Sequence, residues 1–224
     1  TDIEALKKDY DYVVLAVGAS EQGVLKLEAG DTMNALDFLA RFKATEGKVE
    51  LGKNVVVIGG GNTAMDTARA AKRNAGVEKV SLVYRRTRRY MPADEEELVM
   101  AVEDGVEFAE LLAPVKLENG VLYCKKMVLG DMDASGRRGV VETDETVEVP
   151  ADTVIAAVGE KVPGAFYESF GIALDSRRRP QVNQETLETS VKGVYVAGDG
   201  LYGPATVVEG IRDGKMAAEA IIGK

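Results

Sequence analysis

Three consecutive glycines are the residues of this chain whose type and spacing best suit a chemical role. They end an apolar run and open a helix-like pattern, in the order Val55–Ile58, Gly59, Gly60, Gly61, Asn62, Thr63 and Ala64. Gly59 permits a tight turn, Gly61 permits close approach of a pyrophosphate, and the small Ala64 lets a helix pack closely on the strand. The N–H groups at the start of that helix would face the phosphates. The segment predicts a dinucleotide-binding turn, with an unliganded strand–helix turn as the alternative.

A strand, a helix and a second strand must position this turn. The run Val55–Ile58 is continuously apolar, as in a parallel strand that is buried on both faces. In the following helix, Ala64, Met65, Ala68 and Ala71 share one face, and Gly76 is the expected C-terminal cap. A second strand over Lys79–Tyr84 completes a βαβ unit of about 30 residues.

The end of the second strand is rich in arginine where a carboxylate is usual. NAD sites place Asp or Glu about 20 residues after the glycines, on the ribose 2′-hydroxyl. Here Tyr84 is followed by Arg85, Arg86, Thr87, Arg88 and Arg89. Charge-assisted hydrogen bonds contribute about 1.5–3 kcal/mol each, so one or two would favour a 2′-phosphate by roughly 10- to 1000-fold. We expect Arg85 and Arg86 to select NADP(H), the alternative being a solvated basic loop.

Composition excludes several classes of function. The formal net charge of −9 argues against nonspecific nucleic-acid binding, and no apolar run approaches the roughly 20 residues of a membrane span. Without histidine and with Cys124 alone, the chain has no His/Cys metal site, no Ser-His-Asp triad and no Cys-x-x-Cys pair. Cys124 is expected to be a half-buried structural thiol. The absence of a signal peptide pattern makes the cytoplasm the expected location.

An internal similarity predicts two related domains. The segment 11–19 aligns without gaps to the segment 152–160, and both are apolar strands that end in a glycine turn. The predicted fold is α/β, a Rossmann-like domain with a central parallel sheet and an inserted three-stranded β-meander, plus part of a second domain. We expect the nucleotide-binding domain at 51–160 and parts of the second domain at 1–50 and 161–224. A second glycine fingerprint is expected upstream of Thr1.

Further patterns predict two helices and the meander. Asn34 can cap a helix with the apolar face Leu36, Leu39 and Phe42, and another helix is expected over 92–104. The β-rich stretch 106–149 contains an Asn119-Gly120 hairpin signal and a polar tip near 131–138. A final helix over about 204–222 would pack through Val207, Val208, Ile211, Ala217 and Ile221.

These residues resemble a known family along the whole chain. The matching segments are Gly59–Asp66, Tyr84–Arg86, Met91–Pro92, Glu103–Phe108, Gly193–Gly200 and Gly203–Val208. The chain resembles the flavoproteins with two dinucleotide-binding domains, the pyridine nucleotide-disulfide oxidoreductase superfamily, and most of all its glutamate synthase small-subunit branch. The C-terminal segments are similar to selenate reductase flavin/iron–sulfur subunits.

The resemblance assigns the C-terminal part to FAD. It implies that Asp199, which follows Gly198, binds the ribityl and ribose hydroxyls. Gly159, Gly198, Ala205, Thr206 and Val207 are further expected cofactor contacts. A helix start near Ala205 would face the flavin N1/O2 edge, where its positive end stabilises reduced flavin. The alternative is a plain strand–turn–helix in which Asp199 is an N-cap.

The implied function is an electron-input module. It would bind NADPH, pass hydride to FAD and then electrons to iron–sulfur partners, with an upstream FAD-binding half and iron–sulfur domains or subunits as partners. No catalytic side chain is expected, because the cofactors carry the reaction. The competing hypotheses are a non-catalytic pyridine-nucleotide-binding domain and a structural assembly domain. A single-domain dehydrogenase is disfavoured because no Tyr-x-x-x-Lys pattern is present.

Overall fold

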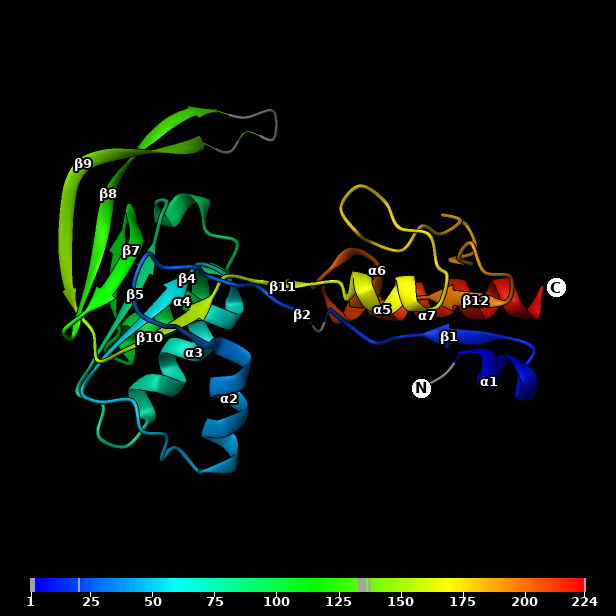
Figure 1. Cartoon of the computed structure of the whole chain (residues 1–224), viewed down its shortest axis with the longest axis horizontal. Coiled ribbons are helices and arrows are strands. Elements are labelled where there is room, and N and C mark those ends of the chain that lie inside the picture. The colour runs from blue at the N-terminus through cyan, green and yellow to red at the C-terminus, as the bar shows by residue number, and fades with distance from the viewer. Residues whose placement is uncertain (1–2, 20, 133–135, 137, 224) are drawn as a thin grey trace. The chain divides into compact units, whose positions relative to one another are not determined.

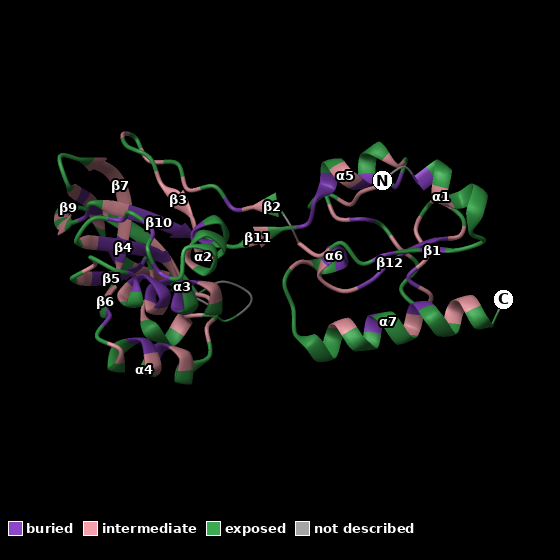
Figure 2. Cartoon of the chain, turned by 90° about the horizontal axis from the view of Figure 1, so that it is seen from below, coloured by how far each residue is buried: buried purple, intermediate pink, exposed green. Residues whose placement is uncertain are grey.

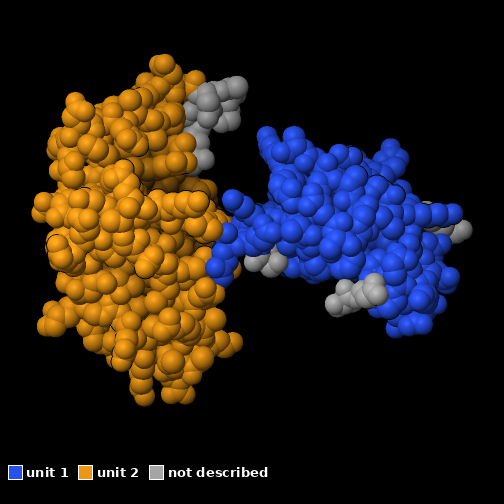
Figure 3. Space-filling model, viewed as in Figure 1, with its two compact units in different colours: residues 1–22, 160–224 blue, residues 23–159 orange. Residues whose placement is uncertain are grey.

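The computed structural model describes residues 3–19, 21–132, 136 and 138–223, and the chain divides into two compact units. Unit 1 comprises residues 1–22 and 160–224, and unit 2 comprises residues 23–159 (Figure 3). The predicted division at residues 50 and 51 therefore differs from the observed one. Residues 23–50 belong to unit 2 because Ala35, Phe38 and Val49 are buried in its core.

Unit 2 is built on a five-stranded parallel sheet. Its strands, in spatial order, are β3 (Met33–Asn34), β10 (Thr153–Ala157), β4 (Asn54–Gly59), β5 (Lys79–Tyr84) and β6 (Glu107–Glu110). Both faces of the sheet are covered, which explains the continuous apolar runs in β4 and β5. The predicted central parallel sheet is confirmed.

Alternate residues of β4 face two different layers. Val55 and Val57 pack with three helices, which are α2 (Ala35–Ala44), α3 (Asn62–Arg73) and α4 (Glu95–Glu103). Val56 and Ile58 pack instead with the antiparallel meander β7 (Leu112–Glu118), β8 (Val121–Met132) and β9 (Arg138–Pro150). Figure 1 shows the helices and the meander on opposite sides of the sheet. The side-chain period of two in a strand thus produces a three-layer unit.

The predicted βαβ unit is present, with one correction. β5 has the predicted bounds, and Ala64, Met65, Ala68 and Ala71 are all buried on one face of α3. The prediction that Gly76 caps the helix is wrong, because α3 ends at Arg73 with Asn74 as its C-cap. The Asn74 side chain binds the Val49 N–H and C=O at 3.0 and 2.7 Å, and this tether ends the helix early.

The meander is confirmed as three-stranded, in the order β7-β8-β9. Asn119 and Gly120 both have positive φ, 51° and 76°, as a tight hairpin between β7 and β8 requires. The predicted β-rich stretch began at residue 106, but its first strand, β6, pairs in parallel with β5 in the central sheet. Of the predicted polar tip, residues 133–135 and 137 lie outside the described residues.

Two helix predictions need correction. Asn34 caps α2 as expected, since its Oδ1 accepts from the Leu36 N–H at 2.7 Å, but Leu36 is 37% exposed and Phe38 is fully buried. Helix α4 begins at Glu95 and not at Pro92. The residues before it are kept out of the helix because the Ala93 N–H binds the Gly60 C=O and the Asp94 N–H binds the Asn62 side chain.

Among its described residues, unit 1 contains two pairs of strands and four helices. β1 (Val13–Leu15) pairs in parallel with β12 (Val194–Val196), and β2 (Glu21–Gln22) pairs antiparallel with β11 (Glu160–Lys161). The helices are α1 (Ile3–Asp9), α5 (Gly164–Ser169), α6 (Asp199–Tyr202) and α7 (Val207–Ile222). Tyr167 and Leu201 are among the buried residues of its core.

Helix α7 is largely uncovered in this chain. The prediction placed its start at 204 and used Val207, Val208 and Ile211 for packing, but the helix begins at 207 and these side chains are 80%, 75% and 55% exposed. Among its described residues only Asp213 and Ala217 are buried (Figure 2). The described part of unit 1 has no element that covers Val207, Val208 and Ile211.

Candidate dinucleotide-binding site

The glycine turn joins β4 to α3, and two of its glycines are required by packing within unit 2. A Cβ at Gly59 would overlap the Ala157 carbonyl oxygen and would lie 2.9 Å from Ala64 Cβ. A Cβ at Gly60 would overlap the Tyr84 ring, with Cδ2 and Cζ at 2.7 and 2.9 Å. These two glycines therefore let the turn approach its neighbouring strands, whether or not a ligand is bound.

Gly61 differs from its two neighbours. A Cβ at this position would meet only Pro92 Cγ, at 4.0 Å, and its φ of −98° and ψ of 175° suit any residue. Nothing in the described structure requires glycine here. Because the added methyl group would project into open space at the helix start, an approaching ligand gives glycine a reason at this position.

The N-terminus of α3 suits an anion. Gly61 is its N-cap and provides no side-chain cap, and the first turn contains no acidic residue, whereas α4 begins with three glutamates. The Asp94 carboxylate, from the segment before α4, binds this turn, and its Oδ2 accepts from Asn62 Nδ2 at 3.0 Å. The partial positive charge of the α3 start is therefore not balanced by a side chain of its own first turn.

The predicted contacts Asn62, Thr63 and Ala64 take different places. Asn62 and Asp94 bind each other twice, side chain to side chain and through the Asp94 N–H at 2.9 Å. The Asn62 side chain thus fixes the segment before α4 to the glycine turn. Thr63 lies in the first turn of α3, partly exposed, and Ala64 is fully buried against the sheet.

The four arginines after β5 are not equivalent. Arg85 is exposed, and no described residue pairs with its guanidinium group. Arg86 Nε donates to the Arg138 carbonyl oxygen at 3.3 Å. Arg88 forms an ion pair with Glu95 at 2.9 Å, and the Arg89 guanidinium lies 6.0 Å from the centre of the Tyr90 ring. Arg85 is therefore the arginine best placed to accept a new anionic partner.

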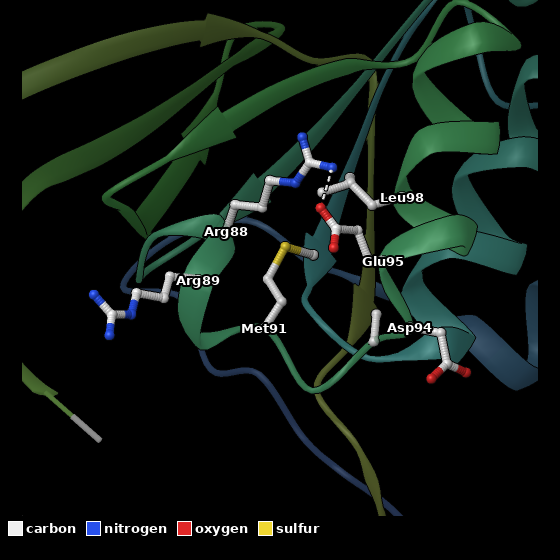
Figure 4. A pocket seen from close by; sticks show the side chains of 7 residues that line it. Arg88, Arg89, Met91, Asp94, Glu95 and Leu98 are labelled. Atoms are coloured by element: carbon white, nitrogen blue, oxygen red, sulfur yellow. Dashed lines mark hydrogen bonds and ion pairs between the residues drawn. The ribbon is translucent and has the colours of Figure 1, made fainter. Parts of the chain in front are cut away.

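A pocket of about 380 Å³ lies between the loop of residues 85–90, called here the arginine loop, and the start of α4. Its lining residues are Arg88, Arg89, Met91, Ala93, Asp94, Glu95 and Leu98 (Figure 4). Two hydrogen-bonded contacts connect it to the glycine turn, Ala93 to Gly60 and Asp94 to Asn62. Sequence reasoning did not identify this pocket, although its lining residue Met91 comes two residues after Arg89.

The remaining predicted cofactor contacts lie within unit 1, with one exception. Gly198, with φ 68°, precedes α6, and Asp199 Oδ1 accepts from the Ala205 N–H at 3.2 Å. Thr206 caps α7 through a capping box with Glu209, so that helix start already has a carboxylate beside it, and Val207 opens the helix. The exception is Gly159, which follows β10 in unit 2 and has φ 97°.

Two ionisable side chains of unit 2, Asp104 and Cys124, lie outside the site. Asp104 binds Arg69 Nε at 2.8 Å and Arg73 Nη2 at 2.6 Å, which joins α3 to the end of α4, and the Arg69 hydrogen bond contributes most to lowering the Asp104 pKa. Cys124 is fully buried, more than predicted, and burial raises its pKa to about 12.

Within the described residues no cluster of His, Cys, Asp or Glu could hold a metal ion, and no helix is long and apolar enough to span a membrane.

Comparisons with known proteins identify related sequences. YgfK of Escherichia coli (strain K12) is 41% identical over 228 residues, which cover 99% of this chain and 22% of that protein. The beta subunit of the NADP(+)-dependent formate dehydrogenase of Moorella thermoacetica is 37% identical, covering 98% of this chain and 32% of that protein. The glutamate synthase [NADPH] small chain of Escherichia coli (strain K12) is 36% identical, covering 98% and 52%. The chain thus spans about a fifth to a half of these relatives.

The fold also matches solved structures. FprA of Mycobacterium tuberculosis in complex with NADPH superposes with a TM-score of 0.79 at 20% sequence identity, covering 100% of this chain and 65% of that chain. The T. acidophilum thioredoxin reductase gives a TM-score of 0.63, also at 20% identity, covering 95% and 65%. A family model described as pyridine nucleotide-disulphide oxidoreductase matches residues 3–214. The chain belongs to the pyridine nucleotide-disulphide oxidoreductase family.

Proposed function

We propose that unit 2 binds NADP(H) and that the chain is the electron-input module of a flavoprotein oxidoreductase. The observation that carries this proposal is the arginine loop at the end of β5, beside a glycine turn in which Gly61 serves no packing need. Two relatives named above use NADP(+) or NADPH, as their names state, and this supports the same cofactor here.

The described residues of unit 2 fit NADP(H) part by part. The pyrophosphate would lie at Gly61 and the α3 N-terminus, where a close backbone and a positive helix end meet. Arg85, with Arg86 beside it, would hold the 2′-phosphate, for which a guanidinium group is well suited. The pocket lined by Met91 and Leu98 offers an apolar surface for the adenosine.

Unit 1 fits part of a flavin site. Asp199 uses Oδ1 to bind the Ala205 N–H, and no described residue pairs with its Oδ2, which is therefore available to a ribityl or ribose hydroxyl. The parallel pair β1 and β12 is too small a sheet for a complete domain, and Val14 is 45% exposed on it. We infer that a further part of the FAD-binding domain covers Val14 and the exposed face of α7.

When bound, NADPH would supply a hydride and FAD would accept it, before electrons pass to iron–sulfur partners. The residues of this chain would bind and orient the two cofactors and exclude water from them. No described side chain has to donate or accept a proton for that reaction. Iron–sulfur domains or subunits of a larger protein would be the partners, and the acceptor would be determined by them.

The test is an equilibrium titration of the chain with NADPH and NADH at matched ionic strength. Arg85→Ala and Arg86→Ala are compared with Arg41→Ala, an exposed arginine of α2 for which no partner is described. We expect the unchanged chain and Arg41→Ala to bind NADPH at least about tenfold more tightly than NADH, and Arg85→Ala to lose most of that preference.

Two results would overturn the proposal. Equal affinity for both nucleotides, unchanged in the arginine variants, would mean that the loop is only a solvated basic surface. Binding of neither nucleotide would favour a structural assembly domain.

A further inference from the structure

We propose that Tyr84 is a positioning residue that connects the glycine turn to the arginine loop and thereby sets the preference for a 2′-phosphate. Tyr84 is the last residue of β5 and directly precedes Arg85 and Arg86. The inference rests on the proposed function, because it explains a preference for NADPH over NADH that the proposed function assigns to unit 2.

The ring of Tyr84 lies against the glycine turn. Tyr84 is 7% exposed, and its ring fills the space that a Cβ at Gly60 would need. The turn also binds the segment that follows the arginine loop, because the Gly60 carbonyl oxygen accepts from the Ala93 N–H at 3.0 Å. The position of the ring and the position of the turn are therefore interdependent.

The hydroxyl of Tyr84 closes the arginine loop. It donates to the Tyr90 carbonyl oxygen at 2.8 Å, so the loop 85–90 begins and ends at the same side chain. Within the loop, the short helix η1 (Arg88–Tyr90) is held by the Tyr90 N–H, which donates to the Thr87 carbonyl oxygen at 2.9 Å. The loop backbone is thus folded back over the end of β5.

A fixed backbone matters for arginines that bind a phosphate. An arginine side chain loses about 2 kcal/mol of rotamer freedom when it is immobilised, and a mobile backbone would add to this cost. The carboxylate of Glu110 gives the loop a second tether, accepting from the Arg88 N–H at 2.8 Å. That tether reaches the middle of the loop, whereas Tyr84 also reaches the glycine turn, so a shift of either part is transmitted to the other.

The test is Tyr84→Phe, which keeps the ring and removes the hydroxyl. Thr153→Val is the matched control, because it removes a hydroxyl that donates to the Leu51 carbonyl oxygen at 2.7 Å in the same unit, at the amino end of β10. Affinities are measured for NADPH and NADH, and for adenosine 2′,5′-bisphosphate against ADP. Hydrogen exchange of residues 85–91 reports the loop directly.

We expect Tyr84→Phe to reduce the ratio of NADPH to NADH affinity by about fivefold or more, as the loss of one net hydrogen bond would. The same factor should appear between adenosine 2′,5′-bisphosphate and ADP, exchange in the loop should accelerate, and the NADH affinity should stay within about twofold. Thr153→Val should change none of these ratios. Gly60→Ala, which displaces the same ring, should reduce the ratio as well.

The inference is wrong if Arg85→Ala abolishes the preference while Tyr84→Phe and Gly60→Ala leave it unchanged. It is also wrong if Tyr84→Phe weakens both nucleotides equally, since that outcome would indicate a general structural role. Should the unchanged chain show no preference for NADPH, the proposed function itself fails. The two failures are therefore distinguishable in the same experiment.

Discussion

Alanine at Gly60 and alanine at Gly61 should differ in their effect on stability, because the two glycines have different surroundings. At Gly60 the new methyl group would overlap the ring of Tyr84, which is buried and hydrogen-bonded and cannot move aside easily. Overpacking of this kind costs about 1–3 kcal/mol. With about 2–4 °C per kcal/mol for a chain of this size, the melting temperature should fall by several degrees.

At Gly61 the same change should leave stability intact. The backbone is already in a region that alanine adopts, and the nearest atom is 4.0 Å away. Loss of glycine from the unfolded chain can even stabilise the protein by about 0.4–1 kcal/mol. Nucleotide binding should nevertheless weaken by about 10- to 100-fold for NADPH and NADH alike, because the methyl group stands where phosphates approach and hinders charged hydrogen bonds.

The assay pairs thermal unfolding with titration of both nucleotides, and Gly214→Ala serves as the control. Gly214 lies in α7, where an added methyl group meets open space, so this variant should bind nucleotides unchanged. Unaltered nucleotide affinity in Gly61→Ala would refute the assignment of the pyrophosphate site. Unaltered stability in Gly60→Ala would refute the packing argument.

Two further predictions concern ionisable groups outside the nucleotide site. Asp152 accepts from the Asn54 and Lys53 N–H groups at 2.8 Å, and the Asn54 bond is the largest cause of its lowered pKa. Its carboxylate therefore stabilises the fold above the ordinary pKa of 3.8, and this contribution disappears as the pH falls through the lowered folded-state value. Asp152→Ala should lower the free energy of unfolding at about pH 7 and flatten its decline below about pH 4, as measured by urea titrations across pH; an equally steep decline would contradict this. Cys124, with its pKa raised to about 12 by burial, should react with a thiol reagent at about pH 8 only after denaturation, and rapid labelling of the native chain would show that β8 opens.

The sequence predicted the elements whose signals are local. The bounds of β5, the buried face of α3 and the Asn119-Gly120 hairpin follow from periodicity and turn chemistry, which neighbouring residues determine. The face of α2 was predicted in part, since Leu39 and Phe42 pack against the core. Leu36 is exposed instead, and the buried positions are Ala35 and Phe38. Helix α7 was expected to be packed, yet no described element covers Val207 or Val208.

Within the candidate site, the sequence pointed to the residues but not to the different contacts that each of them makes. Gly59 and Gly60 are explained by Ala157 and Tyr84, which approach from other strands and leave no mark in a local motif. Arg85 and Arg86 look alike in sequence, and only the carbonyl of Arg138, on β9, distinguishes them. These distinctions depend on long-range contacts that spacing along the chain does not encode.

The interruption of unit 1 by unit 2 has a consequence for the order of folding. Val13 pairs with Val194, so closing this contact in an unfolded chain means restricting a loop of about 180 residues. Folding of unit 2 brings its two ends together, with the Gly23 N–H bound to the Gly159 carbonyl oxygen at 2.7 Å. After that event, the effective loop that separates β1 from β12 is much shorter. During synthesis, unit 2 can be complete before β12 leaves the ribosome. Its early folding would then lower the entropic cost of pairing β1 with β12.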